Sequence, residues 1–142
     1  MFIGEYHHNL DDKNRIIIPV KFREHLGDNF IVSKGLDGCL TIYTIKQWKK
    51  LLDEFSLLPK TKKDARIYIH MLTSKASECT LDKSGRIKLP ATLVEDVKIE
   101  KDCAIIGVDD HVEIWSKSKW EEYYELGSKV FEEVAEKLSE FI

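Results

Sequence analysis

A tandem duplication constrains the fold of this chain more than any other feature of its sequence. Two blocks of residues recur in the same order, the first at an offset of 71 residues and the second at an offset of 72. The matching segments are Leu10–Ile16 with Leu81–Ile87, Pro19 with Pro90, Gly35–Tyr43 with Gly107–Trp115, and Trp48 with Trp120. A one-residue insertion or deletion in a loop accounts for the change of offset. The chain is therefore expected to fold as two related copies of one small unit.

Each copy has the pattern of a β-rich unit. Phe2–Leu10 predicts an extended strand, because Tyr6 and His8 alternate with more polar neighbours. The segments that follow the two turns stop before Pro19 and Pro90, and proline suits the first turn of a helix. The expected elements are strands Arg15–Ile18 and Arg86–Leu89, short helices Val20–Leu26 and Ala91–Val97, and the strand pairs Phe30–Ser33 with Cys39–Tyr43 and Ala104–Gly107 with Val112–Trp115.

A longer amphipathic helix is expected to close each copy, because apolar residues recur there at helical spacing. These residues are Trp48, Leu51, Leu52 and Phe55 in the first copy, and Trp120, Tyr123, Tyr124, Val130, Phe131, Val134, Leu138 and Phe141 in the second. Between the copies, Pro59–Ser74 predicts a linker helix. The predicted organisation is a first unit at residues 5–47, a helical linker at 48–75, a second unit at 76–119 and a C-terminal amphipathic helix at 120–142.

The net charge of -3 is unevenly distributed along the chain. Residues 121–142 contain seven carboxylates and two lysines, a net charge of -5, which leaves +2 on the preceding 120 residues. The chain thus has a mildly basic body and an acidic appendage, so its total charge does not exclude binding to nucleic acid. The acidic helix would repel phosphates and is expected to lie away from any DNA-binding face.

The remaining composition indicates a cytoplasmic protein without membrane contact. No apolar run is long enough to cross a bilayer, and the first residues lack the basic start and apolar middle of a signal peptide. The three cysteines, Cys39, Cys79 and Cys103, are odd in number and none pair at C-x-x-C spacing. We expect buried free thiols, with no disulfide framework, no metal and no cofactor.

An Asp-x-x-x-Arg turn occurs at the equivalent place in both copies, at Asp11–Arg15 and at Asp82–Arg86. The fourth residue of each turn is Asn14 or Gly85, and both residue types accept a positive φ. For a single motif, a local ion pair that fixes the turn is the simplest interpretation. Two copies in one pseudosymmetric unit would instead present two similar cationic loops to a common ligand.

On this hypothesis the ligand is DNA. An arginine fork can bind a phosphate or read guanine O6 and N7, while lysine acts as a point charge. The candidate DNA-binding residues are Arg15, Arg86, Lys13, Lys83, Lys21 and Arg23, with Lys88 nearby. Asp11 and Asp82 are expected to orient the two loop arginines.

Six segments of the chain are typical of one known family. They are Met1–Tyr6, Leu10–Arg15, Pro19–Arg23, Leu58–Arg66, Glu78–Arg86 and Glu113–Ser116. On these segments the sequence resembles the MraZ family of transcriptional regulators, and the likeness covers nearly the whole chain. Asn14 departs from the family pattern, which usually has glycine at this position. Asparagine can adopt the same backbone conformation, so the loop is expected to be retained.

The resemblance implies an α+β, mainly β fold, namely a tandem-duplicated AbrB-like swapped-hairpin β-barrel with peripheral helices. It also implies a ring-shaped homo-oligomer that binds double-stranded DNA at repeated promoter boxes. Such a ring acts at the nucleoid and usually represses a cell-division and cell-wall gene cluster. Carried over residue by residue, the implicated loop residues are Asp11, Arg15, Asp82 and Arg86. Lys13 and Lys83 are added from their charge and position, and no small-molecule substrate is implied.

Two other functions remain open at this point. One is an oligomeric protein-interaction scaffold that does not contact DNA. The other is a hydrolase that uses Asp11 and Asp82 as paired carboxylates, which the neighbouring cations disfavour because they keep each carboxylate ionised. The chain has no Walker loop, nucleophile elbow or zinc-protease motif, so we expect that it is not an enzyme.

Several further residues have a structural and a functional interpretation. His7 and His8 are adjacent in a predicted strand and point to opposite faces, so they cannot share a metal there. The three tryptophans are expected to pack in the core rather than stack on bases. The basic run Lys60–Arg66 could contact DNA, but a solvated face or an inter-subunit contact is the preferred interpretation. The apolar stripe of the C-terminal helix is a candidate oligomer contact, although packing on its own domain would require the same stripe.

Overall fold

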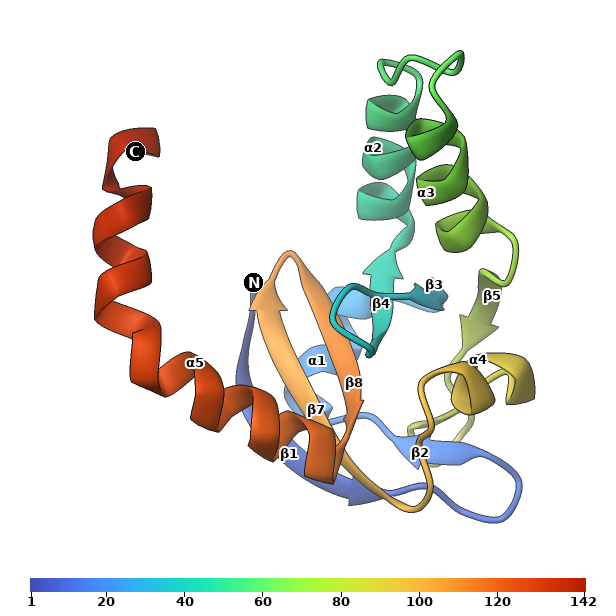
Figure 1. Ribbon diagram of the computed structural model, residues 1–142. Coiled ribbons are helices and arrows are strands. Elements are labelled where there is room, and N and C mark those ends of the chain that lie inside the picture. Colours follow the sequence, from blue (N-terminus) through green and yellow to red (C-terminus); the bar gives the residue numbers. More distant parts are fainter.

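The computed structural model describes residues 1–142, and the same order of elements occurs in both copies of the repeat (Figure 1). The first copy contains β1 (Phe2–Asn9), β2 (Arg15–Ile17), α1 (Val20–Leu26), β3 (Asn29–Lys34), β4 (Leu40–Thr44) and α2 (Ile45–Phe55). A connecting helix, α3 (Lys63–Thr73), follows it. The second copy contains β5 (Ser77–Thr80), β6 (Arg86–Lys88), α4 (Ala91–Asp96), β7 (Asp102–Asp109), β8 (His111–Ser116) and α5 (Lys117–Leu138), which ends in the short 3-10 helix η1 (Ser139–Phe141).

The strands of the two copies pair with each other throughout the body. A six-stranded antiparallel sheet has the order β1-β7-β8-β4-β3-β5, so that β1 of the first copy lies beside β7 of the second. At the other edge, β5 of the second copy pairs with β3 of the first. A separate two-stranded ribbon joins β2 to β6. Neither copy could form these sheets alone.

One apolar cluster of 20 buried residues joins both sheets to the short helices α1 and α4. Ile16 and Ile87 pair directly in the β2–β6 ribbon and are fully buried. Beneath β1, the ring of Phe22 meets those of Phe2 and Tyr6 edge to face, at centroid distances of 5.5 and 5.3 Å. Burial of each such side chain stabilises the fold by roughly 1.5–3 kcal/mol. The ribbon is thus held rigidly on the body.

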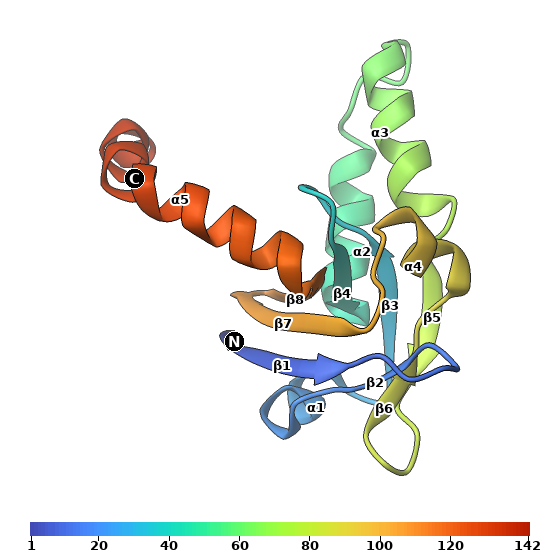
Figure 2. The ribbon, with the colours of Figure 1, turned by 60° about the horizontal axis from the view of Figure 1, so that its bottom comes forward.

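Two helical arms leave this body in different directions (Figures 1 and 2). The helices α2 and α3 stand side by side as a hairpin, closed by the rings of Phe55 and Tyr68 at 5.4 Å. The other arm is α5, whose first turns pack on Trp115 through Trp120 and Tyr123. From residue 121 onward every residue of the chain is exposed.

The α+β class is confirmed. Helices hold 42% of the residues and strands 30%, so the expectation of a mainly β protein describes the body and not the arms. The predicted alternation in β1 is confirmed as well, because Tyr6 and His8 are half-buried while Glu5 and His7 are exposed. No helix of the chain combines the length and apolar character that crossing a bilayer requires.

The helix boundaries differ from the sequence-based ones for local reasons. Helix α2 begins at Ile45, before Trp48, because the Thr44 hydroxyl accepts a hydrogen bond from the backbone N–H of Gln47 at 3.1 Å and caps the helix. The linker helix does not begin at Pro59. Pro59 begins a turn, in which its carbonyl accepts a hydrogen bond from the N–H of Lys62. Helix α3 starts after this turn, at Lys63.

The tryptophans lie as expected, whereas Cys79 is less buried than expected. Trp115 is almost completely buried, and Trp120 packs on it with ring centroids 5.3 Å apart. Trp48 packs on Tyr43 at 5.6 Å. These contacts confirm that the tryptophans serve packing. All three cysteines are free, and two of them are buried.

Candidate nucleic-acid interface

The first Asp-x-x-x-Arg turn is organised by one carboxylate. Oδ1 of Asp11 accepts hydrogen bonds from the backbone N–H groups of Lys13 at 2.9 Å and Arg15 at 2.8 Å. Its other oxygen, Oδ2, accepts from Nε of Arg15 at 2.8 Å. Asn14 completes the turn with a φ of 59°. The short polar side chain of asparagine tolerates this left-handed conformation, as expected.

The second turn repeats this arrangement. Oδ1 of Asp82 accepts from the N–H groups of Ser84 at 2.8 Å and Arg86 at 2.9 Å, and Oδ2 accepts from Nε of Arg86 at 2.9 Å. Gly85 occupies the fourth position with a φ of 76°. Both turns therefore use the aspartate to fix the backbone and to hold the arginine by its Nε.

The terminal guanidinium nitrogens remain available in both turns. Those of Arg15 make no hydrogen bond within the chain, and Nη1 of Arg86 lies 3.8 Å from Oδ2 of Asp11. Each arginine side chain is about one-third exposed, at 30% and 31%. This geometry leaves a forked donor directed outward on an oriented stem, which is the form in which arginine binds phosphates or base edges.

The β2–β6 ribbon joins the two turns into one surface. Its antiparallel register pairs Arg15 with Lys88 and Ile17 with Arg86, which places the turns at opposite ends of the ribbon. The ion pair from Arg86 to Asp11 links them across it. In Figure 2 both turns project from the lower right of the body, on the side away from α5. The acidic helix thus lies away from the turns, as the sequence predicts.

Backbone hydrogen bonds also tie each turn to the other copy. The N–H of Ile18 donates to the carbonyl of Gly85 at 2.9 Å, and the N–H of Leu89 donates to the carbonyl of Asn14 at 2.8 Å. The carbonyl of each fourth turn residue is therefore held by the chain that follows the other turn. These two hydrogen bonds couple the positions of the two turns.

Arg23 makes a contact that has no equivalent in the first turn. Its Nε donates to the carbonyl of Ile18 at 2.8 Å, and its guanidinium lies over the Cα of Gly85, so close that a Cβ there would collide with it. The residue equivalent to Arg23 in the second copy is Val94, and the residue equivalent to Gly85 is Asn14. Glycine is therefore needed in one turn for space as well as for φ.

Both turn aspartates are held in the charged form. The pKa of Asp11 is lowered chiefly by the hydrogen bond from the backbone N–H of Arg15, with help from its guanidinium. The pKa of Asp82 is lowered in the same way by Arg86. A shared proton between the two carboxylates is not needed, and the geometry is that of two separate ion pairs. This arrangement disfavours the hydrolase hypothesis.

The other predicted cations surround the turns without fixed partners. Lys13, Lys83 and Lys21 are exposed, the first two at the tips of the turns and the third on α1. Lys13 and Lys83 are not equivalent residues, since Asp12 stands in the first turn where Lys83 stands in the second. The exposed Lys88 lies opposite Arg15 in the ribbon. The second turn consequently has one more net positive charge than the first.

No group of three or more His, Cys, Asp or Glu side chains is arranged to hold a metal ion. His7 hydrogen-bonds Glu5 on its own strand at 2.6 Å. His111 lies between Asp110 and Glu113, at 2.7 and 2.9 Å, and the hydrogen bond to Glu113 is the main reason why its pKa is raised. These pairs stabilise local structure on the sheet.

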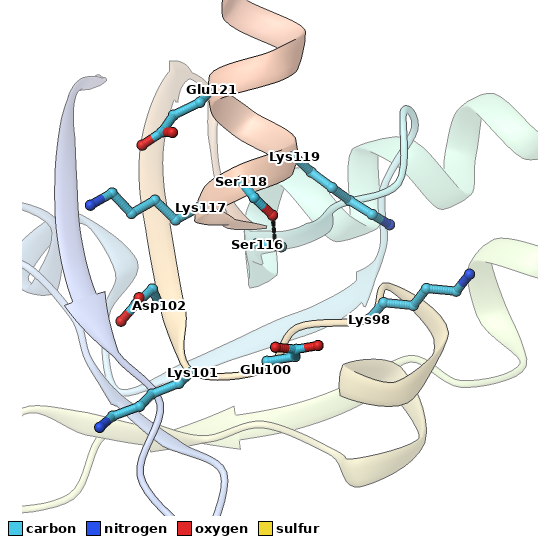
Figure 3. Close-up of a pocket in the computed structure, with 9 residues that line it drawn as sticks. All are labelled: Lys98, Glu100, Lys101, Asp102, Ser116, Lys117, Ser118, Lys119 and Glu121. Atoms are coloured by element: carbon cyan, nitrogen blue, oxygen red, sulfur yellow. Dashed lines mark hydrogen bonds between the residues drawn. The ribbon is translucent and has the colours of Figure 1, made fainter.

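A polar hollow of about 470 Å³ lies elsewhere, where the first turn of α5 meets the β7 end of the sheet (Figure 3). Its lining contains no hydrophobic residue, and its four lysines are Lys98, Lys101, Lys117 and Lys119. The ammonium groups of Lys101 and Lys117 point away from those of the other two (Figure 3). Lys119 also donates to the carbonyl of Val97 at 3.2 Å. The cations do not converge on one ligand position.

Comparison with known protein families gives a match along almost the entire chain. Residues 1–69 and 72–141 each match the family model described as "MraZ protein, putative antitoxin-like". The two matches correspond to the two copies of the repeat. The matched residues include both Asp-x-x-x-Arg turns.

Full-length relatives give the same result. The chain is 48% identical over 141 residues to a protein of Natranaerobius thermophilus, covering 99% of each chain. It is 50% identical over 141 residues to one of Caldanaerobacter subterraneus subsp. tengcongensis, again covering 99% of each. It is 51% identical over 140 residues to one of Thermoanaerobacter pseudethanolicus, covering 99% of this chain and 98% of the other. All three carry the name "Transcriptional regulator MraZ".

Proposed function

Because the chain belongs to the MraZ family, we propose that it regulates transcription by binding specific double-stranded DNA through its two Asp-x-x-x-Arg turns. Transcription regulation is the function that its full-length relatives carry in their names, and none of those names describes an enzyme. In this proposal the chain forms a ring-shaped homo-oligomer that acts at the nucleoid in the cytoplasm. The ring represses a cell-division and cell-wall gene cluster by binding repeated boxes in its promoter.

The observation that carries the proposal is the repeated turn geometry. Two arginines are held by Nε on aspartates while their terminal nitrogens stay unoccupied or nearly so. Holding the stem in place beforehand reduces the entropy lost when the guanidinium binds, and the fork suits phosphate and guanine alike. A purely structural ion pair would not require the same arrangement twice on one ribbon.

The surrounding charge supports the same surface. Lys13, Lys83 and Lys21 are exposed near the turns and would add phosphate contacts, while Arg23 borders the second turn. The acidic α5 points elsewhere, so the net charge of -3 does not describe the face that meets DNA. In a ring several such faces would act together, since linked sites raise the effective concentration of one another.

The test measures retardation of promoter fragments that are first selected by the protein from its host genome. Arg15→Ala and Arg86→Ala are each expected to weaken DNA binding by roughly tenfold or more, and their combination is expected to abolish it. Lys129→Ala is a matched control, because it also removes one positive charge but lies on α5 beside Glu125. Mass measurement must show that the variants keep their oligomeric state.

Salt dependence separates this function from the scaffold alternative. Binding through phosphate contacts weakens steeply as salt is raised, and loss of one contact reduces that slope. A scaffold that does not contact DNA retards no fragment at any salt concentration. Normal retardation by both arginine variants would show that the turns are not the interface.

A further inference from the structure

The distal part of α5, together with the short helix η1 that ends it, carries an exposed apolar stripe. Tyr124, Phe131, Val134, Leu138 and Phe141 recur at helical spacing and are all exposed, Phe131 by 73%. We call these residues the α5 stripe. Side chains of this size are costly to leave in water on so long a helix, so the stripe is a surface that a partner would cover.

The stripe is also hollowed at the end nearer the body. A groove of about 430 Å³ runs past Trp120, Tyr124 and Phe131. Gly127 lines this groove, and a Cβ added there would meet no atom within van der Waals distance. A partner helix could therefore approach the α5 backbone closely at this point.

A second apolar groove lies on the other arm of the molecule. It occupies about 380 Å³ between α3 and the turn that joins β3 to β4. Its apolar lining residues are Leu36, Ile67, Tyr68, Met71 and Leu72. We call this surface the α3 groove. Of these residues only Leu72 is buried, and Ile67 is 47% exposed.

The two surfaces belong to segments of opposite charge. Residues 45–75, which include α2 and α3, contain eight lysines and arginines against three carboxylates, a net charge of +5. Residues 121–142 have a net charge of -5. Complementary potentials of this kind favour association between the two arms and determine which surfaces meet. Pairing of two α5 helices would instead bring two segments of charge -5 together.

We propose that the α5 stripe of one copy of this chain docks in the α3 groove of a second copy. The inference rests on the proposed ring-forming regulator and assigns the contact that would build the ring. The arms lie on different sides of the body in both views (Figures 1 and 2), so a chain cannot satisfy its own groove. Contacts between two different surfaces repeat head to tail and close as a ring when the rotation permits.

Two single substitutions isolate the two sides of this contact. Ile67→Asp puts a charge into the groove but leaves the stripe intact, and Phe131→Asp does the reverse. Each variant alone is expected to associate roughly a hundredfold more weakly than the original chain and to behave as a monomer. Leu57→Asp and Leu126→Asp are matched controls, because both residues are exposed and lie outside the two surfaces, and they keep the assembly.

Mixing the two defective variants gives the decisive result. The intact stripe of the Ile67→Asp chain can dock in the intact groove of the Phe131→Asp chain, and no further docking is possible. Native mass spectrometry of isotopically distinguished chains should therefore show a heterodimer and nothing larger. Circular dichroism and thermal melting check that both variants are folded.

Three outcomes overturn the proposal: a monomeric original chain, normal assembly of Ile67→Asp, or a mixture that stays monomeric. Normal assembly of Ile67→Asp together with monomeric Phe131→Asp would identify α5–α5 pairing as the contact. The same samples are run against the selected DNA fragments. Normal assembly of Ile67→Asp with retained DNA retardation overturns the interface alone, whereas the arginine variants test DNA binding independently.

Discussion

The two Asp-x-x-x-Arg turns have the same internal hydrogen bonds but different neighbouring residues. Within each turn the aspartate accepts two backbone N–H groups and one Nε, and corresponding distances agree to within 0.1 Å. In the surroundings, Arg23 covers the second turn at Gly85. At the first turn the equivalent positions are Val94 in place of Arg23 and Asn14 in place of Gly85, so no arginine covers it in this way. Local chemistry thus determines the shape of a turn, and the packing around it determines which residue can stand at its fourth position.

The electrostatic surroundings of the turns also differ. Arg86 contacts the aspartates of both turns, but Arg15 contacts only its own. Asp12 reduces the positive charge of the first turn, where the second has Lys83. Both turns thus hold their arginine in the same way, and the second turn is the more basic. The comparison makes four predictions, taken from the largest expected effect to the smallest.

The ribbon beneath the turns should be equally sensitive in both copies. Ile16→Ala and Ile87→Ala each remove a fully buried side chain from a directly paired position, and each is expected to lower the free energy of unfolding by about 2–5 kcal/mol. Urea unfolding curves measure the free energy of unfolding of both variants. A difference of more than about 1.5 kcal/mol between them would mean that the two halves of the ribbon are not packed equivalently.

DNA binding should depend more on the second turn than on the first. Loss of Arg86 removes a cation from the more basic turn and also leaves Asp11 with one cation fewer. Arg86→Ala is therefore expected to weaken binding by roughly a hundredfold, and Arg15→Ala by roughly tenfold. Titration of labelled DNA with each variant measures its dissociation constant. Equal losses would indicate that the cross-turn contact has no role in binding.

The fourth turn position should show the opposite tolerance in the two copies. Gly85→Ala places a Cβ at positive φ and displaces Arg23, at an expected cost of about 1–2 kcal/mol in the free energy of unfolding. Asn14→Gly retains the backbone conformation and should change stability by less than about 0.5 kcal/mol. Thermal unfolding compares the two variants.

A double variant identifies the source of the Gly85 effect. If the collision with Arg23 is the cause, Gly85→Ala costs less in an Arg23→Ala background than in the original chain. Additive effects of the two changes would assign the whole cost to backbone strain.

The smallest effect concerns acid. The pKa values of Asp11 and Asp82 lie below the ordinary 3.8, so both turns are stabilised above that pH, and this stabilisation is lost as the pH falls through the lowered values. Asp11→Asn and Asp82→Asn should each flatten the dependence of melting temperature on pH below about 4. Carboxyl NMR titrations should give lowered pKa values for both groups; an ordinary value in either turn would break the equivalence.

Much of the body could be predicted from its sequence because the relevant signals are local. The repeat, the prolines that end β2 and β6, and the turn residues Asn14 and Gly85 predicted the element order and the positive φ values that the structure contains. The cap at Thr44 could also have been found, since Thr44 and Gln47 are spaced as an N-cap and its N3 residue. Helix α2 would then have been placed correctly.

The contacts between the copies could not be predicted from local patterns. Nothing near Gly85 in the sequence indicates that Arg23, on α1, will cover it. The ion pair between Arg86 and Asp11 likewise depends on the register of β2 against β6. Duplication predicts similar strands in both halves, but similar strands compete for the same partners, so the pattern does not determine which of them pair.

The exchange of strands between the copies has a consequence for how the chain is made. In the register of β1 with β7, Phe2 lies opposite Asp109, so the first strand to leave the ribosome has its partner in almost the last part of the body. At roughly 5–20 residues per second, β1 waits about 5–20 s for that partner. The sheet has a high contact order and closes only once the second copy has been synthesised. During this interval the edge of β1 is unpaired, and an unpaired strand edge is a template on which another chain can add a strand.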